Sequence, residues 1–300
     1  MFRRVDSRAS EMRLRFSSLL LAAFVSIGLS CVAQAQSVTS GGAAIHYIEA
    51  GPSSGKTLVL IPGWSCASGV WKKQVAYFSK TIHVFDIDPR SQGESGKTDD
   101  GNFPEQRARA YEAVFAALKL NNAVLVGWSQ GVQDVAAYVT QFGTKRLSGV
   151  VLVDAAVSKG AASVAANPKF VQGQLAYMDI YAKHKREYLE GMMHAIFSQP
   201  MPDADFKALV DTGMKTPTNT GIAELNADML GADLTAALKN FDKPTLIVAS
   251  SASFELAQQK AEVSILPHGS FAQIDHAAHG VFVDQPDAFN RILADFIRKT

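Results

Sequence analysis

The five residues Gly127-Trp128-Ser129-Gln130-Gly131 fit the pattern G-x-S-x-G, and they stand between an apolar run and a helical pattern. A serine in a tight strand-to-helix turn exposes its hydroxyl group, and flanking glycines let neighbouring backbone pass closely. The N-terminus of the following helix also offers backbone N–H groups to an oxyanion. The pattern therefore predicts that Ser129 is a catalytic nucleophile and not an ordinary turn serine.

A serine hydroxyl group needs a general base, and two histidines near the C-terminus are candidates. His276 and His279 precede the trio Asp284-Gln285-Pro286. This segment resembles the C-terminal motif of the α/β-hydrolase superfamily, where a histidine stands five residues before an acidic-Gln-Pro trio. The resemblance implies that His279 is the base, with Ala278 where the family usually has glycine. His276 is the alternative base.

Two further segments resemble the same superfamily. Residues 62–64 (PGW) are similar to its His-Gly-x segment after the third strand, with proline in place of the histidine. The resemblance implies that the backbone N–H groups of Trp64 and Gln130 form an oxyanion hole. Residues 88–95 (DPRSQGES) are similar to the family's D-x-R-G-x-G-x-S turn, with Ser91 in place of the first glycine. This resemblance implies a structural turn and not a reactant.

The acid of a triad must orient the histidine and stabilise its charged form. Most members of the superfamily carry an aspartate after the penultimate strand, but the corresponding loop here, residues 250–255, contains no Asp. Asp154 closes an apolar run after the nucleophile helix, which is the other known location in this fold and the active edge of such a sheet. Asp154 is therefore the predicted acid. The alternative acids are Glu255 and Asp275, and a site without an acid is a further alternative. Asp154 would then have a structural role.

The elements that must position these residues follow from hydrophobic patterning. Strand-like runs cover residues 44–49 (expected as an edge strand), 56–62, 81–87, 122–127, 147–153 and 245–249, with another at 263–266 or 271–274. Helical spacing covers residues 70–78, 104–120, 131–142 and 286–299. Residues 157–240, here called the cap segment, have helical patterning only.

Strand–helix alternation interrupted by a helical insertion predicts an α/β protein with a mostly parallel central sheet flanked by helices. Together with the resemblance it implies the α/β-hydrolase fold, with a helical cap inserted before the last strands. The predicted domains are a signal peptide at 1–35, the first part of the α/β-hydrolase core at 36–156, the cap at 157–240 and the second part of the core at 241–300.

The N-terminus has the composition of a secretory signal. Several arginines precede the apolar run 16–32, and Ala33-Gln34-Ala35 supplies the small-x-small pattern that a signal peptidase needs. Cleavage after Ala35 predicts a periplasmic or secreted protein, and the run is too short for a confident membrane span. Translation from Met1 or Met12, an uncleaved anchor helix and a lipoprotein at Cys31 remain alternatives.

The rest of the composition limits the possible partners. A chain of 300 residues with net charge +1 is ordinary for a globular protein, and nothing in it favours nucleic acid. The histidines lack metal-ligand spacing, and no G-x-G-x-x-G opens a strand–helix–strand unit, so neither a metal nor a dinucleotide cofactor is predicted. Cys66 is expected to be a small buried thiol. The predicted partner is a small molecule, and the oligomeric state is not predicted.

These features predict a serine hydrolase that cleaves a carboxylic ester or lactone of a small to medium hydrophobic substrate through an acyl-enzyme. A cofactor-free haloperoxidase or perhydrolase, or a carbon–carbon bond hydrolase, would share the same triad and remains an alternative. Ser129 argues against epoxide hydrolases and haloalkane dehalogenases, which use an aspartate nucleophile. A non-catalytic ligand-binding protein of the same fold is the alternative from another class.

Overall fold

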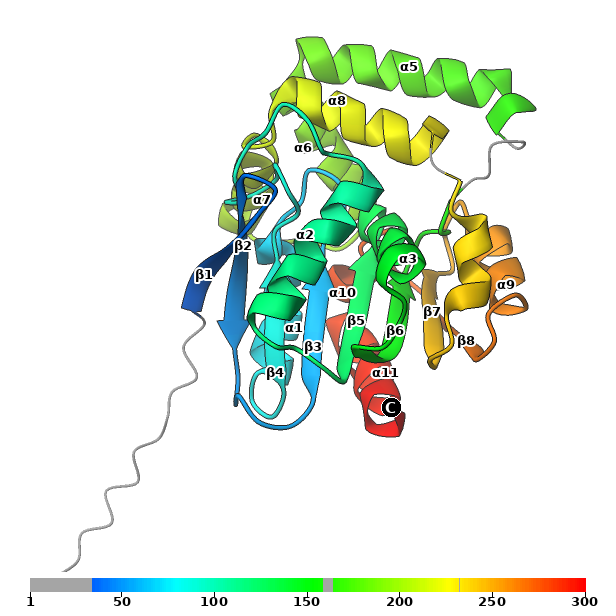
Figure 1. Ribbon diagram of the computed structural model, residues 1–300. Coiled ribbons are helices and arrows are strands. Elements are labelled where there is room, and N and C mark those ends of the chain that lie inside the picture. The colour runs from blue at the N-terminus through cyan, green and yellow to red at the C-terminus, as the bar shows by residue number, and fades with distance from the viewer. Residues whose placement is uncertain (1–33, 159–163, 232) are drawn as a thin grey trace, which may run out of the picture. The chain divides into compact units, whose positions relative to one another are not determined.

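The computed structural model describes residues 34–158, 164–231 and 233–300 (Figure 1). The predicted signal peptide lies outside the described residues, apart from Gln34 and Ala35. Its cleavage, the choice between Met1 and Met12, and the lipoprotein alternative at Cys31 stay predictions.

The described strands form one sheet in the order β1-β2-β4-β3-β5-β6-β7-β8. The pairs β1/β2 and β2/β4 are antiparallel, and the other pairs are parallel. The predicted mostly parallel sheet is therefore confirmed. The strands are β1 (Gln34–Ser40), β2 (Ala43–Ala50), β3 (Thr57–Ile61), β4 (His83–Ile87), β5 (Ala123–Trp128), β6 (Leu147–Val153), β7 (Thr245–Ser250) and β8 (Gly269–Ile274).

The ends of the sheet differ from the expectation in two places. Residues 44–49 do not form an edge strand, because β1 pairs with the outer side of β2 through a turn at Gly41 and Gly42. The sequence of β1, QAQSVTS, has too few large apolar side chains to show a strand pattern. Of the two candidates for the last strand, 271–274 is confirmed within β8. Val263 instead ends α9 (Leu256–Val263).

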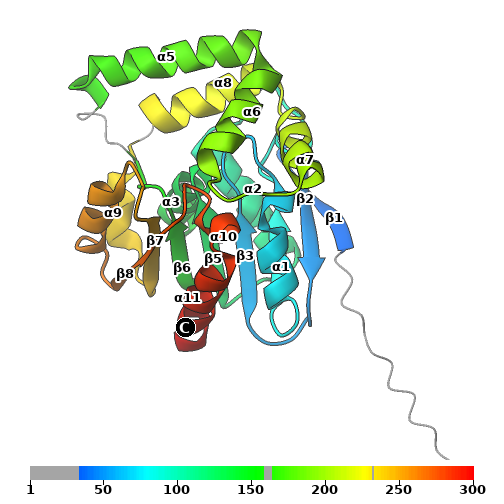
Figure 2. The ribbon, with the colours of Figure 1, turned by 180° about the vertical axis from the view of Figure 1, so that it is seen from behind.

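Helices cover both faces of the sheet (Figures 1 and 2). One face packs against α2 (Pro104–Ala117) and α3 (Gln130–Phe142), and the other against α1 (Lys72–Phe78), α10 (Val281–Asp284) and α11 (Pro286–Lys299). Alternate residues of β3 enter the two cores, Val59 and Ile61 on the first face and Leu58 and Leu60 on the second. Burial on both faces explains why this strand is continuously apolar.

In the described part of the cap segment, all of the regular secondary structure is helical. Figures 1 and 2 both show α5 and α8 side by side, with α6 and α7 beside them. The elements are α5 (Pro168–Lys183), α6 (Lys185–Ile196), α7 (Asp203–Gly213), α8 (Thr218–Asn226), the π-helical turn η2 (Ala227–Gly231) and the 3₁₀ helix η3 (Thr235–Asn240). Over the described ranges, no helix is both long and apolar enough to cross a membrane.

Candidate active site

Ser129 occupies a strained turn between β5 and α3. Its φ and ψ are 56° and −122°, a conformation that a non-glycine residue adopts only where the surrounding structure holds it. A Cβ atom on Gly127 would lie 2.2 Å from the carbonyl oxygen of Gly131, and one on Gly131 would lie 2.7 Å from that of Ile61. The two glycines of the motif are therefore required by close backbone approach.

The loop after β3 runs directly against this turn. A Cβ atom on Gly63 would lie 2.9 Å from the Cβ atom of Ser129. Gln130 is the first residue of α3, so its backbone N–H has no acceptor within that helix. Trp64 follows Gly63 in the adjacent loop and lines the same pocket as Ser129. Backbone N–H groups at these two positions are suited to bind an oxyanion.

His279 and Asp154 are brought together from distant parts of the chain. His279 Nδ1 lies 2.8 Å from Asp154 Oδ2, and the Ser250 N–H donates to Asp154 Oδ1 at 2.6 Å. Asp154 is 1% exposed. Burial raises the pKa of Asp154 above its usual value, and the His279 hydrogen bond opposes that shift. Asp154 is thus placed to fix the orientation of the imidazole ring.

The other candidate side chains have different neighbours. Glu255 stands at the N-cap of α9 and accepts a hydrogen bond from the Ala156 N–H at 2.8 Å. Asp275 is exposed, and a hydrogen bond from Gln273 lowers its pKa. His276 is also exposed. The carboxyl group that the structure places against His279 is that of Asp154.

The spacing of the C-terminal motif has a structural cause. Asp284 folds back so that its Oδ2 accepts from the Ala278 N–H and from Ser198 Oγ, both at 2.8 Å. Trp128 Nε1 donates to the His279 carbonyl oxygen at 3.0 Å. The histidine loop is therefore tied to the cap segment on one side and to the nucleophile turn on the other.

Ser129 and His279 line one pocket of about 70 Å³. Its walls come from the core and from the cap segment, and they combine apolar and aromatic side chains with two carboxyl groups. The other lining residues are Trp64, Gln130, Gln133, Ala155, Leu225, Asp228, Met229, Phe254 and Glu255.

Comparison with known proteins places these features in a family. The model of the alpha/beta hydrolase family matches residues 58–292. The chain belongs to the alpha/beta hydrolase family.

This α/β hydrolase is similar over most of its length to two proteins from other bacteria. It is 25% identical over 272 residues to the bifunctional esterase/perhydrolase DCH of Acinetobacter calcoaceticus, which covers 87% of this chain and 98% of that protein. It is 25% identical over 276 residues to a non-heme haloperoxidase of Rhodococcus erythropolis, covering 86% and 97% of the two chains.

Solved structures share the fold of this α/β hydrolase. The esterase RhEst1 from Rhodococcus sp. ECU1013 superposes with a TM-score of 0.76 at 26% identity, covering 89% of this chain and 98% of that one. The enol-lactonase from Burkholderia xenovorans LB400 superposes with a TM-score of 0.73 at 19% identity, covering 88% and 100%. The predicted superfamily is therefore confirmed.

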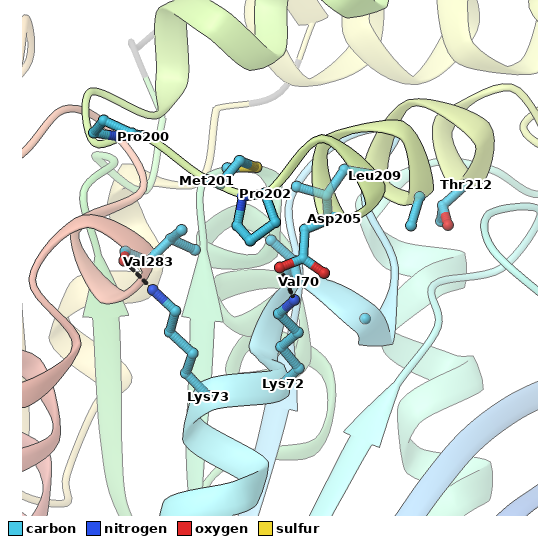
Figure 3. Close-up of a pocket in the computed structure, with 12 residues that line it drawn as sticks. Val70, Lys72, Lys73, Pro200, Met201, Pro202, Asp205, Leu209, Thr212 and Val283 are labelled. Atoms are coloured by element: carbon cyan, nitrogen blue, oxygen red, sulfur yellow. Dashed lines mark hydrogen bonds and ion pairs between the residues drawn. The ribbon is translucent and has the colours of Figure 1, made fainter.

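A larger pocket of this α/β hydrolase, about 270 Å³, lies between α7 and α1 (Figure 3). Lys72 pairs with Asp205 at 2.5 Å, and Lys73 Nζ donates to the Val283 carbonyl oxygen at 2.9 Å. Its lining includes none of Ser129, His279 and Asp154. Volume alone does not make an active site, so the smaller pocket at Ser129 is the candidate.

Two residues at the site had no signal in the sequence. Gln92 Nε2 donates to Gln130 Oε1 at 2.6 Å, and Gln130 Nε2 donates to Asp228 Oδ2. Gln92 belongs to the turn for which the resemblance implies only a structural role, and Asp228 is one of several acidic residues in the cap segment. A local pattern could not reveal either contact, because each joins elements far apart in the sequence.

The remaining polar candidates are structural or inert. Asp88 anchors its turn, since its two oxygens accept from the Ser68 N–H at 2.7 Å and the Glu94 N–H at 2.8 Å. Cys66 is buried, and burial raises the pKa of its thiol to about 12, which disfavours the reactive thiolate. In the part of the chain that the structure describes, no group of three or more histidine, cysteine or acidic side chains is arranged to hold a metal ion.

Proposed function

We propose that this α/β hydrolase is a serine esterase that cleaves carboxylic esters or lactones through an acyl-enzyme. The observation that carries the proposal is the 2.8 Å contact of His279 with Asp154, in a loop whose imidazole shares a pocket with Ser129. Nucleophile, base and acid are then available in one place, as covalent acyl transfer requires. The relatives named as esterases support the same chemistry.

The mechanism follows from these roles. His279 Nε2 removes the proton from Ser129 Oγ as the oxygen attacks the substrate carbonyl carbon. Asp154 accepts the hydrogen bond from Nδ1–H and stabilises the imidazolium ion that forms. The backbone N–H groups of Trp64 and Gln130 bind the oxyanion. The imidazolium ion then protonates the leaving alcohol, and His279 activates the water that hydrolyses the acyl-enzyme.

The pocket favours small, uncharged acyl groups. Its volume of about 70 Å³ accommodates only a few heavy atoms beside Ser129. Trp64, Leu225 and Phe254 supply apolar contact, whereas the carboxyl group of Glu255 disfavours an anionic substrate. Short-chain esters of hydrophobic alcohols, and small lactones, are the substrates proposed.

A second candidate function is perhydrolysis, in which hydrogen peroxide replaces water as the acceptor of the acyl group. It is favoured by the names of the relatives from Acinetobacter calcoaceticus and Rhodococcus erythropolis. Adding hydrogen peroxide to the ester reaction and assaying peroxyacid tests it directly. Alcohol release without any peroxyacid would leave hydrolysis as the function.

The test of the esterase is turnover of a short-chain p-nitrophenyl ester by the purified protein. Wild-type protein is expected to release p-nitrophenol and to be labelled at Ser129 by an aryl phosphonate, as detected by peptide mass spectrometry. Ser129→Ala and His279→Ala are expected to abolish turnover while the circular dichroism spectrum is unchanged. Absence of both turnover and labelling in the wild type would instead support the ligand-binding alternative.

We also propose that the chain is exported and cleaved after Ala35. The supporting observation is the basic and apolar N-terminus followed by Ala33-Gln34-Ala35. N-terminal sequencing of protein recovered from the periplasm of a bacterial host is expected to begin at Gln36. An intact N-terminus in the membrane fraction would support the anchor helix.

A further inference from the structure

The side chain of Gln130 is held at both ends inside the protein. Its Oε1 accepts from Gln92 Nε2 at 2.6 Å, and its Nε2 donates to Asp228 Oδ2. The residue is 4% exposed, so water does not compete for these groups. Gln130 follows Ser129, and its backbone N–H is the proposed oxyanion donor. Whatever restrains this side chain therefore also restrains that N–H.

Asp228 is in turn held by Arg107 of α2. Arg107 Nη2 lies 2.9 Å and 3.2 Å from the two carboxylate oxygens. The guanidinium group is fixed on its other sides, since Nε donates to Asp134 at 2.7 Å and Nη1 donates to the Asn102 carbonyl oxygen at 2.5 Å. A buried guanidinium fork that is paired in this way is a rigid support.

Asp228 is the acid of the cap segment that contacts Arg107 directly. One arginine faces three buried acids, Asp134, Asp228 and Glu224. Burial raises the pKa of Glu224 well above its usual range, and Glu224 accepts from Gln92 Nε2 at 3.2 Å instead of contacting Arg107 directly. Burial also raises the pKa of Asp228, but Arg107 and Gln130 oppose that shift. Asp228 is therefore the acid of the cap segment that balances Arg107.

We propose that Asp228 positions the oxyanion hole through the side chain of Gln130, which links the cap segment to the nucleophile turn. The inference rests on the proposed serine esterase, because only an acyl-transfer reaction places an oxyanion at the Gln130 N–H. Asp228 acts on Gln130 and not on the reacting atoms, so it is a positioning residue. Ester turnover then requires the cap segment to be seated against α2, where Arg107 holds Asp228.

The first test replaces the side chain of Gln130 without removing its N–H. Gln130→Met keeps the chain length and loses both hydrogen bonds. We expect kcat for the p-nitrophenyl ester to fall by about 10- to 100-fold with KM within about threefold, because a misplaced donor weakens transition-state binding alone. Asp228→Asn keeps an acceptor oxygen and loses the charge, so a smaller fall in kcat is expected.

The matched control is Asp211→Asn, which changes an exposed acid on α7 of the cap segment. Its kcat and KM are expected to equal those of the wild type. If Gln130→Met fails to fold, Asp228→Asn carries the test, because it weakens the restraint that the proposal invokes. Unchanged kcat and KM in a folded Asp228→Asn protein would then contradict the proposal.

The decisive measurement is the double variant Gln130→Met/Asp228→Asn. If Asp228 acts through Gln130, the kcat of the double variant is no lower than the kcat of the single variant Gln130→Met. If the fold-loss of kcat in the double variant equals the product of the losses in the two single variants, the two residues act separately and the proposal is overturned. A raised KM with unchanged kcat in Asp228→Asn would also overturn it, because Asp228 lines the pocket and would then contact the substrate directly.

Failure of the esterase itself has a separate signature. If wild-type protein neither turns over the ester nor reacts with the phosphonate at Ser129, the esterase proposal fails, and the positioning role falls with it. If the wild type is active and the variants of Gln130 and Asp228 match it, only the positioning role is overturned.

Discussion

Asp154 and Glu255 follow neighbouring strands of the sheet, yet their carboxyl groups have different partners. Asp154 faces His279 Nδ1 at 2.8 Å, whereas Glu255 accepts from the backbone of Ala156. A buried carboxylate that accepts from the imidazole holds one tautomer and one ring orientation, and a carboxylate bound to backbone does not. The acid of the proposed triad is therefore decided by hydrogen bonding at the scale of single residues.

Asp154→Asn is predicted to lower kcat by about 10² to 10⁴, the range found when triad acids are removed, because the amide no longer stabilises the imidazolium ion. Glu255→Gln, which makes the same kind of change from acid to amide in the wall of the pocket at Ser129, is predicted to lower kcat by less than tenfold. Initial rates with a p-nitrophenyl ester measure both variants. A damaging Glu255→Gln beside a silent Asp154→Asn would reverse the assignment.

At the scale of elements, the nucleophile turn depends on how closely β5 and α3 approach each other. A Cβ atom on Gly127 would meet the Gly131 carbonyl oxygen at 2.2 Å, a contact that the backbone must move to relieve. Backbone atoms cannot rotate away as a side chain can. A Cβ atom added at Gly127 would therefore displace the backbone at Ser129, which lies between the two glycines.

Gly127→Ala is predicted to lower the free energy of unfolding by about 1–3 kcal/mol, the usual cost of overpacking, and to reduce activity because Ser129 is displaced. Gly173 is the matched control, since it lies in α5 and a Cβ atom there meets nothing within 4 Å. Gly173→Ala is predicted to stabilise the protein by up to about 1 kcal/mol. Urea denaturation compares the two variants, and equal stabilities would contradict the close approach.

At the scale of the whole molecule, α9 is joined to the point where the chain leaves β6 for the cap segment. Glu262 of α9 is 3% exposed, and its Oε1 accepts from the Val157 N–H at 3.1 Å. Burial raises the pKa of Glu262 from 4.5 to about 8. The folded state therefore binds a proton that the unfolded chain releases between these values.

The sign of the pH effect follows from that difference. Because the folded state binds more protons between about pH 4.5 and pH 8, the stability contributed by Glu262 is present at low pH and is lost as pH rises through this window. The predicted loss is on the order of 1 kcal/mol per pH unit. Glu262→Gln is predicted to remove this slope in urea denaturation from pH 5 to pH 8, whereas Glu187→Gln, at an exposed position of α6, retains it. Parallel curves for wild type and Glu262→Gln would contradict the raised pKa.

Much of the fold was predictable because its signals are local. Strands β3, β5 and β6 are covered on both faces, so their burial appears as short continuous apolar runs. The turn at Ser129 was also recognisable, since its glycines are demanded by backbone contacts within a few residues. By contrast, β1 has few large apolar residues and exists through its pairing with β2, which single-strand patterning does not show.

By itself, the sequence determined the family, the strand–helix alternation and the candidates Ser129 and His279. Each of these depends on residues close together in the chain. Tertiary structure decided which carboxyl group faces His279, because β6 and β7 carry Asp154 and Glu255 to the same edge and only their packing orients them. It also decided that Asp228 of the cap segment reaches Gln130. Long-range contacts of this kind leave no local pattern, since their geometry exists only after the chain has folded.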